Sequence, residues 1–230
     1  MHLLSLLDCG CGTGENSCMF ARRGFCVTGI DLSPSSIKKA KENAKNLVID
    51  VNFMRKDAQT FNLRKKYDIV FCMGVLMYLD NPQEAFKNIA SHTKKGGTLV
   101  VGVYNTYGSL FKRIHTRKKL QQIYGEDDEI KIQYFLSKNP SLKNLPNYRE
   151  LILDGISVPV EKFFSINTLV SWFKENGFML ELASPPIDFK SYLFLKRVSA
   201  ARYSKVDSFF VQLIWKFLKK DFFVISGKKY

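Results

Sequence analysis

Strand-like and helix-like segments alternate over residues 3–103, and this alternation constrains the fold more than any other feature of the sequence. Apolar runs bounded by turn residues alternate with helical segments that carry Lys and Glu on one side. This order predicts an α/β fold: a doubly wound, Rossmann-like, mostly parallel sheet with helices on both faces. The runs expected to form strands are 3–8, 25–31, 51–55, 67–73 and 98–104.

Capping residues and glycines set the expected helix boundaries in this half of the chain. Ser33 is a natural N-cap, and Pro34 occupies the first helical position after it. Further helices are expected over about 15–23 and over 82–93, the second of them closed by the glycines of the sequence KKGG.

The regular alternation ends after Tyr104. Ser165 is expected to cap a helix, and 179–183 has the pattern of a sixth strand. We therefore predict one domain built on a seven-strand sheet, with insertions after strand 5 and between strands 6 and 7. Its expected parts are a first half, an insertion, a helix with strand 6, a basic aromatic insertion and the last strand, over 1–105, 106–164, 165–186, 187–221 and 222–230.

Composition limits the compartment and the class of protein. The chain has 230 residues, 46% of them hydrophobic, which is enough for one sizeable core. Its apolar runs fall short of the roughly 20 residues that a spanning helix needs, so we expect a cytoplasmic protein. The five cysteines contain no CxxC pair and favour reduced thiols over a disulfide framework or a metal site.

A glycine-rich turn, LLDCGCGTGENS, follows the first apolar run and usually marks a nucleotide site. A dinucleotide fingerprint requires a third glycine where Glu15 stands, and that carboxylate would repel a pyrophosphate. A phosphate-binding loop is excluded as well, because Gly-Lys-Ser/Thr does not follow. The turn therefore indicates a nucleoside ligand without a pyrophosphate.

Acidic residues at the ends of three successive strands indicate which ligand this is. Asp8, before the glycines, can accept from an ammonium group, while the turn N–H groups suit a carboxylate. Asp31 is placed to bind both ribose hydroxyls. Asp57 can accept from an adenine amine, with Leu32 and Ala58 as apolar walls. An amino acid, a ribose and an adenine together indicate S-adenosylmethionine.

With these motifs the chain resembles the class I, seven-strand, SAM-dependent methyltransferases. The sequence GVLMYLDNPQEAF, which starts at Gly74, is similar to the branch that includes quinone-biosynthesis methyltransferases. A histidine commonly stands near Met77 or Tyr78 in that branch, and this chain departs from the pattern there. The resemblance implies cofactor contacts from Asp8, Gly10, Gly12, Gly14, Asp31, Leu32, Asp57, Ala58, Cys72 and Met73.

Methyl transfer from a sulfonium needs alignment and exclusion of water more than catalytic groups. A hydroxyl or acidic carbon acceptor is helped by a general base, for which the candidates are His115, Tyr78 and Glu161. His115 lies among lysines and arginines, so a solvent-exposed helical position is the alternative interpretation.

The excess of basic residues indicates an anionic partner, because the net charge is +14. Residues 187–230 hold ten Lys/Arg against three Asp/Glu. In the resembling family, insertions select the substrate. A helix over 206–218 is expected there, with Asp207 near its N-cap and a polar stripe through Ser208 and Gln212. It could lie in an anionic membrane interface, cover a lipid-like acceptor, or cover the sheet.

Three functions are compatible with these observations. The first is methyl transfer from SAM to O, N or C of a small-molecule or lipid-like acceptor. The second is an RNA methyltransferase, favoured by the charge and by a loose similarity of DGISVPVEKFF to tRNA wobble-uridine carboxyl methyltransferases. The third is a non-catalytic subunit with the methyltransferase fold.

Overall fold

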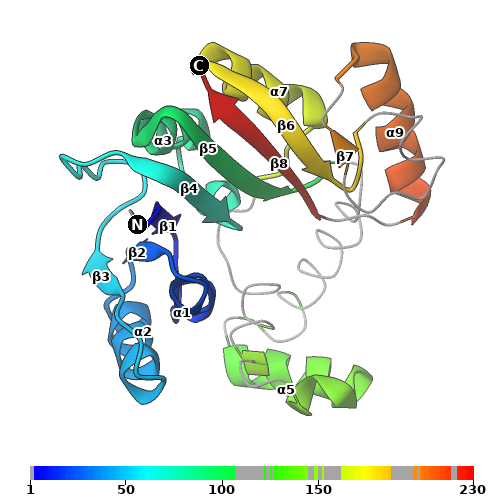
Figure 1. Ribbon diagram of the computed structural model, residues 1–230. Coiled ribbons are helices and arrows are strands. Elements are labelled where there is room, and N and C mark those ends of the chain that lie inside the picture. Colours follow the sequence, from blue (N-terminus) through cyan, green and yellow to red (C-terminus); the bar gives the residue numbers. More distant parts are fainter. Residues whose placement is uncertain are drawn as a thin grey trace.

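A computed structural model describes residues 3–106, 122, 125, 127–144, 148–149, 152, 162–187, 199–200, 203–218 and 222–230. Within them, eight strands form one sheet in the order β3-β2-β1-β4-β5-β8-β6-β7 (Figure 1). The strands are β1 (Ser5–Cys9), β2 (Cys26–Asp31), β3 (Asn52–Arg55), β4 (Tyr67–Met73), β5 (Thr93–Tyr104), β6 (Phe178–Ser184), β7 (Ser199–Ala200) and β8 (Phe222–Lys229).

The sheet is parallel through its first five strands and reverses at β8. Strands β1 to β5 pair in parallel, while β8 runs antiparallel to both of its neighbours, β5 and β6. This confirms the predicted mostly parallel α/β sheet. The strand beyond the seven predicted is β7, which lies inside the stretch 187–221 that was expected to be an insertion. Two residues are too few to show a strand periodicity in a sequence.

Helices cover both faces of the sheet, as predicted. Phe20 of α1 packs on Phe71 of β4 with ring centroids 5.1 Å apart. Val70 and Cys72 point to the other face, because side chains alternate along a strand, and are buried in one cluster with Phe86 of α3. The helices are α1 (Glu15–Arg22), α2 (Pro34–Asn46), α3 (Pro82–Ser91), α5 (Asp128–Lys138), α7 (Ile166–Glu175) and α9 (Lys205–Leu218), with short 3-10 turns η1 (Leu76–Tyr78) and η2 (Pro140–Asn144).

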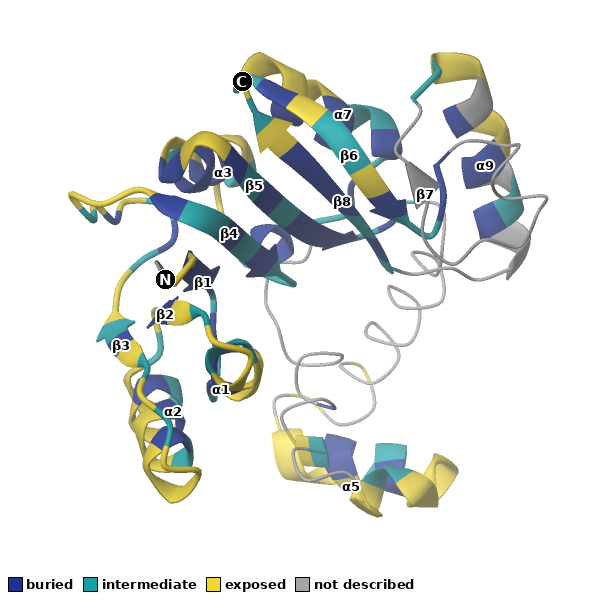
Figure 2. Ribbon diagram, viewed as in Figure 1, coloured by how far each residue is buried: buried dark blue, intermediate teal, exposed yellow. Residues whose placement is uncertain are grey.

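Aromatic packing holds α3 and α7 together on one face, beside β5, β8 and β6 (Figure 1). The Phe86 ring lies 5.6 Å from Trp172 and 5.2 Å from Phe173, centroid to centroid. All three side chains are buried, and burial of each contributes about 2 kcal/mol. Buried residues run along β5 and β8, whereas α2 exposes its outer side (Figure 2).

Most expected element boundaries agree with the structure, and the largest difference is at β5. Ser33 and Ser165 cap α2 and α7, each accepting a bond from the backbone N–H three residues later. Helix α3 ends at Ser91, and the sequence KKGG lies inside β5 rather than in a turn. The cause is tertiary, because Thr93 pairs with Tyr67 of β4 across a register shift.

Helix α9 is present where it was expected, but Ser208 and Gln212 of its polar stripe face inward. Ser208 and Gln212 are buried, and the Gln212 side-chain oxygen accepts from the Ile166 N–H of α7 at 3.0 Å. Phe209 is exposed instead. The polar stripe thus binds the first turn of α7, a role that periodicity alone could not reveal. Among the described residues, no helix is long and apolar enough to span a membrane.

Candidate functional site

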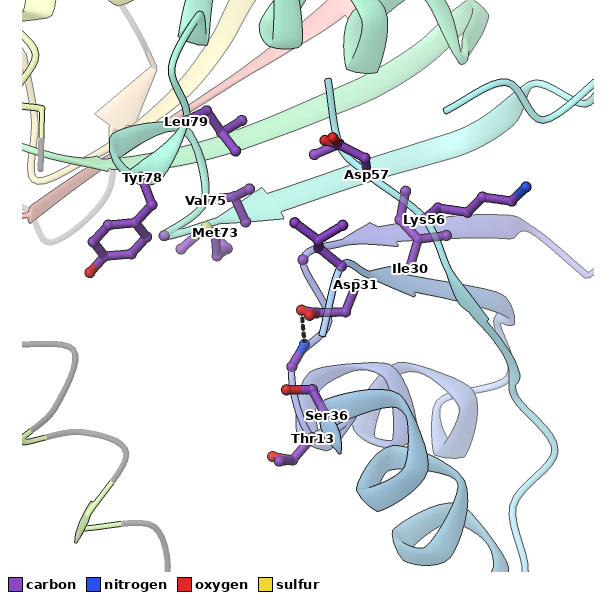
Figure 3. Close-up of a pocket in the computed structure, with 15 residues that line it drawn as sticks. Thr13, Ile30, Asp31, Ser36, Lys56, Asp57, Met73, Val75, Tyr78 and Leu79 are labelled. Atoms are coloured by element: carbon purple, nitrogen blue, oxygen red, sulfur yellow. Dashed lines mark hydrogen bonds between the residues drawn. The ribbon is translucent and has the colours of Figure 1, made fainter. Parts of the chain in front are cut away.

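A pocket of about 460 Å³ lies at the carboxyl ends of β1, β2 and β4 (Figure 3). Loops meet at this edge in doubly wound sheets, and ligands bind there. The volume is in the range of small-molecule sites. The pocket is lined by Gly10, Gly12, Thr13, Ile30, Asp31, Leu32, Ser36, Lys56, Asp57, Ala58, Met73, Gly74, Val75, Tyr78 and Leu79.

The three glycines of the turn have different roles. All have positive φ, at 75°, 53° and 82° for Gly10, Gly12 and Gly14. A Cβ on Gly10 would lie 2.1 Å from a Val75 methyl, and one on Gly14 would lie 2.7 Å from Phe53. A Cβ on Gly12 would meet nothing within 4 Å. Gly12 therefore borders open pocket space, whereas Gly14 is buried and serves packing of the turn.

Asp31 ends β2 and is fixed at the pocket by two backbone bonds. Its Oδ2 accepts from the Gly12 N–H at 2.9 Å, and its Oδ1 accepts from the Ser33 N–H at 2.9 Å. Figure 3 shows the carboxylate beside the turn. Each carboxylate oxygen keeps acceptor capacity for a further donor. Asp31 can therefore accept from two adjacent ligand hydroxyls without moving.

Asp57 follows β3 and borders the same pocket. Its Oδ1 accepts from the Gln59 N–H at 2.8 Å, which fixes the carboxylate in the loop. Ala58 is nearly buried beside it, and Leu32 is half exposed at the pocket rim. This part of the pocket thus offers one acceptor between apolar surfaces, an arrangement that suits a planar base with an amine.

Asp8 lies beneath the glycine turn and does not line the pocket. It is 2% exposed and accepts a 2.6 Å bond from the Ser17 hydroxyl. Burial raises the pKa of this carboxyl to about 6, the Ser17 bond opposes that rise, and the Asp31 charge adds to it. Any influence of Asp8 on a ligand therefore passes through the turn.

The thiols near the turn are buried and unreactive in character. Burial raises the pKa of Cys11, and the neighbouring Cys72 thiol, followed by burial, raises the pKa of Cys9. Cys72 is fully buried, so Met73 and Gly74 line the pocket at the end of β4 in its place. In the described part of the chain, no cluster of His, Cys, Asp or Glu could hold a metal ion.

Of the three candidate bases, Tyr78 lines the pocket, from η1 (Figure 3). His115 and Glu161 lie outside the described residues. The pocket also contains residues that sequence reasoning missed, among them the hydroxyl-bearing Thr13 and Ser36. Thr13 lies inside the glycine turn, and Ser36 follows the N-cap by three residues. Proximity to these two motifs was the sequence signal that could have identified both as pocket residues.

A short segment joins η1 to the end of β5 beside the pocket. The Lys162 N–H donates to the Met77 carbonyl at 2.8 Å, and the Phe164 N–H donates to the Tyr104 carbonyl at 2.9 Å. The Phe163 and Tyr104 ring centroids are 6.4 Å apart. These contacts fix the position of the turn that carries Tyr78.

Comparison with known families decides the classification. A family model described as a methyltransferase domain matches residues 2–148, well over half of the chain. The chain belongs to the methyltransferase domain family. This confirms the resemblance found in the glycine turn and in the acidic residues at the strand ends.

Two relatives of this methyltransferase-family chain carry the name ubiquinone biosynthesis O-methyltransferase. It is 36% identical over 101 residues to the ubiquinone biosynthesis O-methyltransferase of Coxiella burnetii, covering 44% of this chain and 43% of that protein. It is 32% identical over 102 residues to the enzyme of the same name from Rickettsia canadensis, covering 44% of this chain and 43% of that protein. The matched part thus spans less than half the length of these curated relatives.

Solved structures share the methyltransferase fold over nearly the whole chain. Magnesium protoporphyrin IX methyltransferase from Synechocystis PCC 6803, with bound SAH, has a TM-score of 0.58 at 16% identity, covering 99% of this chain and 75% of that chain. A possible histamine N-methyltransferase from Thermotoga maritima has a TM-score of 0.58 at 17% identity, covering 100% and 84%. Identities this low show the fold alone.

The pocket is compatible with S-adenosylmethionine, the cofactor that the resemblance to the class I methyltransferases implies. Asp31 presents two carboxylate oxygens at the pocket edge, and Asp57 presents an acceptor between apolar surfaces. The Gly12 position leaves the space that a Cβ would take. The carboxylate acceptors and the free volume of the pocket are thus compatible with the cofactor.

Proposed function

We propose that the chain binds S-adenosylmethionine in this pocket and directs methyl transfer to a small-molecule acceptor, with oxygen as the favoured acceptor atom. The fixed position of Asp31 carries the proposal, because two backbone bonds hold its carboxylate at the pocket edge. The names of the curated relatives, which are O-methyltransferases, support oxygen.

Each part of the cofactor is assigned residues that contact it. Asp31 binds the ribose hydroxyls, and Asp57 accepts from the adenine amine while Leu32 and Ala58 cover the ring faces. The backbone at Gly10 and Gly12 borders the methionine part, with its N–H groups already bonded to the Ile30 carbonyl and the Asp31 carboxylate. The bound cofactor supplies an electrophilic methyl group, and the chain aligns it and excludes water.

The acceptor side of the pocket is apolar, with one hydroxyl. Met73, Val75 and Leu79 line it together with Tyr78, whose ring also lies there (Figure 3). Such a surface orients an apolar acceptor by contact rather than by charge. The Tyr78 hydroxyl is the described group that could accept or relay a proton from an acceptor hydroxyl. Tyr78 is therefore assigned to orientation or proton transfer.

Methyl transfer from radiolabelled S-adenosylmethionine to a panel of phenols and catechols, some with alkyl chains, tests the proposal. Asp31→Asn should lower transfer at least tenfold, while Asp50→Asn, in an exposed loop, should leave it unchanged. Tyr78→Phe should lower kcat more than it raises KM for the cofactor. Transfer that is insensitive to Asp31→Asn would overturn the assignment of the pocket.

The other partners considered from the sequence remain predictions. RNA, an anionic membrane surface or a lipid-like acceptor was assigned to the insertions 106–164 and 187–221, of which only parts lie within the described residues. The cytoplasmic or peripheral membrane location expected from the sequence also remains a prediction.

The structure of the [4+2]-cyclase SpnF shares this fold, with a TM-score of 0.58 at 16% identity, covering 99% of this chain and 75% of that chain. The activity therefore has to be argued from the site.

A further inference from the structure

A second hollow, of about 540 Å³, lies at the opposite end of β4 from the cofactor pocket. Lys66 lines this hollow and directly precedes Tyr67, the first residue of β4, whereas Met73 at the far end of that strand lines the cofactor pocket. A seven-residue strand is about 20 Å long. The Lys66 side of the hollow is therefore distant from Met73, although the Asn88 amide on its other side donates to the carbonyl of Ala58, which lines the cofactor pocket, at 3.4 Å. The second hollow is lined by Thr60, Phe61, Asn62, Leu63, Arg64, Lys65, Lys66, Asn88, Ser91 and His92.

Hydrogen bonds at the end of α3 form the floor of the hollow. The His92 Nε2 accepts from the Leu63 N–H at 3.2 Å, its Nδ1 lies 2.9 Å from the Asn88 carbonyl oxygen, and its ring stacks on Phe61 at 4.3 Å. The Asn88 amide donates to the Phe61 carbonyl at 3.0 Å. These bonds join the loop to the helix, so the hollow has a fixed floor.

Three consecutive cations, Arg64, Lys65 and Lys66, form the rim of the hollow, and all are exposed. Lys65 lies over the ring of Tyr67, with its nitrogen 5.2 Å from the centroid. Within the described ranges, no carboxylate lies within ion-pairing distance of any of the three. The positive charge of the rim is therefore not compensated locally.

Further cations reach this edge from two neighbouring strands. Because β8 runs antiparallel to β5, its end with Lys228 and Lys229 lies beside the start of β5 with Lys94 and Lys95. The Lys229 ammonium donates to the Ala90 carbonyl at 2.8 Å, next to Ser91 and His92 of the hollow. Burial and the charge of Lys66 both lower the pKa of Lys229. Apart from Lys94, which is paired with Asp68, these cations add positive charge near the hollow.

Carboxylates near this edge are engaged by other groups. Asp68 accepts from the Lys94 ammonium at 2.9 Å and from the Ser5 hydroxyl at 2.6 Å. Glu181 accepts from the Thr98 hydroxyl at 3.3 Å. These bonds leave the cations at the rim of the hollow open to an anion from outside the chain.

We propose that this hollow, with its rim of Arg64, Lys65 and Lys66, binds the phosphate group of an anionic ligand. Arginine presents paired donors that match phosphate oxygens, and lysines add mobile charge. The ligand that carries this phosphate is a phosphate ester or a phospholipid headgroup. The rim lies at the opposite end of β4 from Met73, which is on the acceptor side of the cofactor pocket, so the bound phosphate group belongs to a second ligand and not to the methyl acceptor.

Calorimetric titration with inorganic pyrophosphate at low ionic strength tests the proposal, because salt screens such contacts. The informative variant is Arg64→Gln/Lys66→Gln. Its matched control, Lys38→Gln/Lys41→Gln, removes the same charge from the exposed side of α2. Saturable binding is expected for the wild-type chain and the control, with affinity at least tenfold weaker in the hollow variant. S-adenosylhomocysteine should bind all three proteins equally, whether or not pyrophosphate is present.

Vesicles of phosphatidylcholine with phosphatidic acid distinguish the two sources of phosphate. Vesicle binding that pyrophosphate displaces and that Arg64→Gln/Lys66→Gln weakens would assign a lipid headgroup. Pyrophosphate binding without vesicle binding would assign a soluble ligand. The proposal is overturned if neither probe binds, or if the control variant loses as much affinity as the hollow variant. Binding of an RNA oligonucleotide alone would also overturn it.

Discussion

The Asp31 carboxylate accepts a 2.9 Å hydrogen bond from the backbone N–H of Gly12, and this bond ties the end of β2 to the turn after β1. The same carboxylate also accepts from the Ser33 N–H at the start of α2. One side chain thus fixes two of the loops that form the cofactor pocket. The binding site and the local fold therefore depend on the same residue.

Two glycine substitutions should separate folding from cofactor binding. Gly10→Ala places a Cβ 2.1 Å from a Val75 methyl at φ 75°, so we expect a loss of about 3 kcal/mol or more in unfolding free energy. Gly12→Ala, with nothing within 4 Å, should lose only about 1 kcal/mol but weaken S-adenosylhomocysteine binding more than tenfold. Urea unfolding and calorimetry measure the two effects. Equal losses of stability in both variants would contradict this distinction.

Asp8 should make stability fall as pH rises through weakly acidic values. The pKa of Asp8 is about 6 in the folded chain against 3.8 for an ordinary Asp, so Asp8 stays protonated up to a higher pH in the folded state than in the unfolded state. Between pH 3.8 and about pH 6 the free energy of unfolding therefore decreases as the pH rises. The stability difference between wild type and Asp8→Asn should change by up to about 3 kcal/mol between pH 4 and pH 7.5, in favour of the variant at the higher pH. A difference that does not vary with pH would be inconsistent with a buried ionising Asp8.

Asp68 should have the opposite pH dependence. Bonds from Ser5 and Lys94 hold the pKa of this carboxyl well below its usual range. Its contribution to stability is therefore present above about pH 4 and is lost as pH falls below it. Asp68→Asn should lower the unfolding free energy by about 1–2 kcal/mol at pH 7 and by progressively less in acid. Urea titrations at several pH values test this, and an undiminished difference at pH 3 would count against it.

Val48 is a site where substitution should stabilise the protein. It has φ 55° and is 93% exposed just after α2, where a glycine usually ends a helix. Val48→Gly removes the strain of a β-branched side chain in the left-handed region and should raise the unfolding free energy by about 1 kcal/mol. The neighbouring Leu47 has φ −88°, so Leu47→Gly should lower it by a similar amount. Stabilisation by both or by neither would refute this explanation.

The local part of the site could be predicted from the sequence, because a strand, a turn and a capped helix are short-range features. The position of Asp31 and Gly12 at the pocket could be predicted from the spacing between consecutive motifs alone. Val75 and Leu79 were missed as lining residues, because their position depends on how η1 is fixed beside β4. The burial of Gly14 likewise depends on contacts of the turn with Phe53 and α2.

The inward orientation of α9 also required tertiary information. An apolar and a polar stripe were visible in the sequence, but which of them met the sheet was undetermined. The Gln212 side chain is buried because it supplies the acceptor for the Ile166 N–H at the start of α7, a residue 46 positions away. Only the packing of α9 on α7 reveals that partner.

Calorimetric titration with S-adenosylhomocysteine tests the central assignment most directly. The wild-type chain and Asp50→Asn, an exposed control, should bind with micromolar affinity, and Asp31→Asn should bind at least tenfold more weakly. Absence of binding by the wild-type chain, or equal affinity of Asp31→Asn, would contradict the assignment of this pocket to the cofactor.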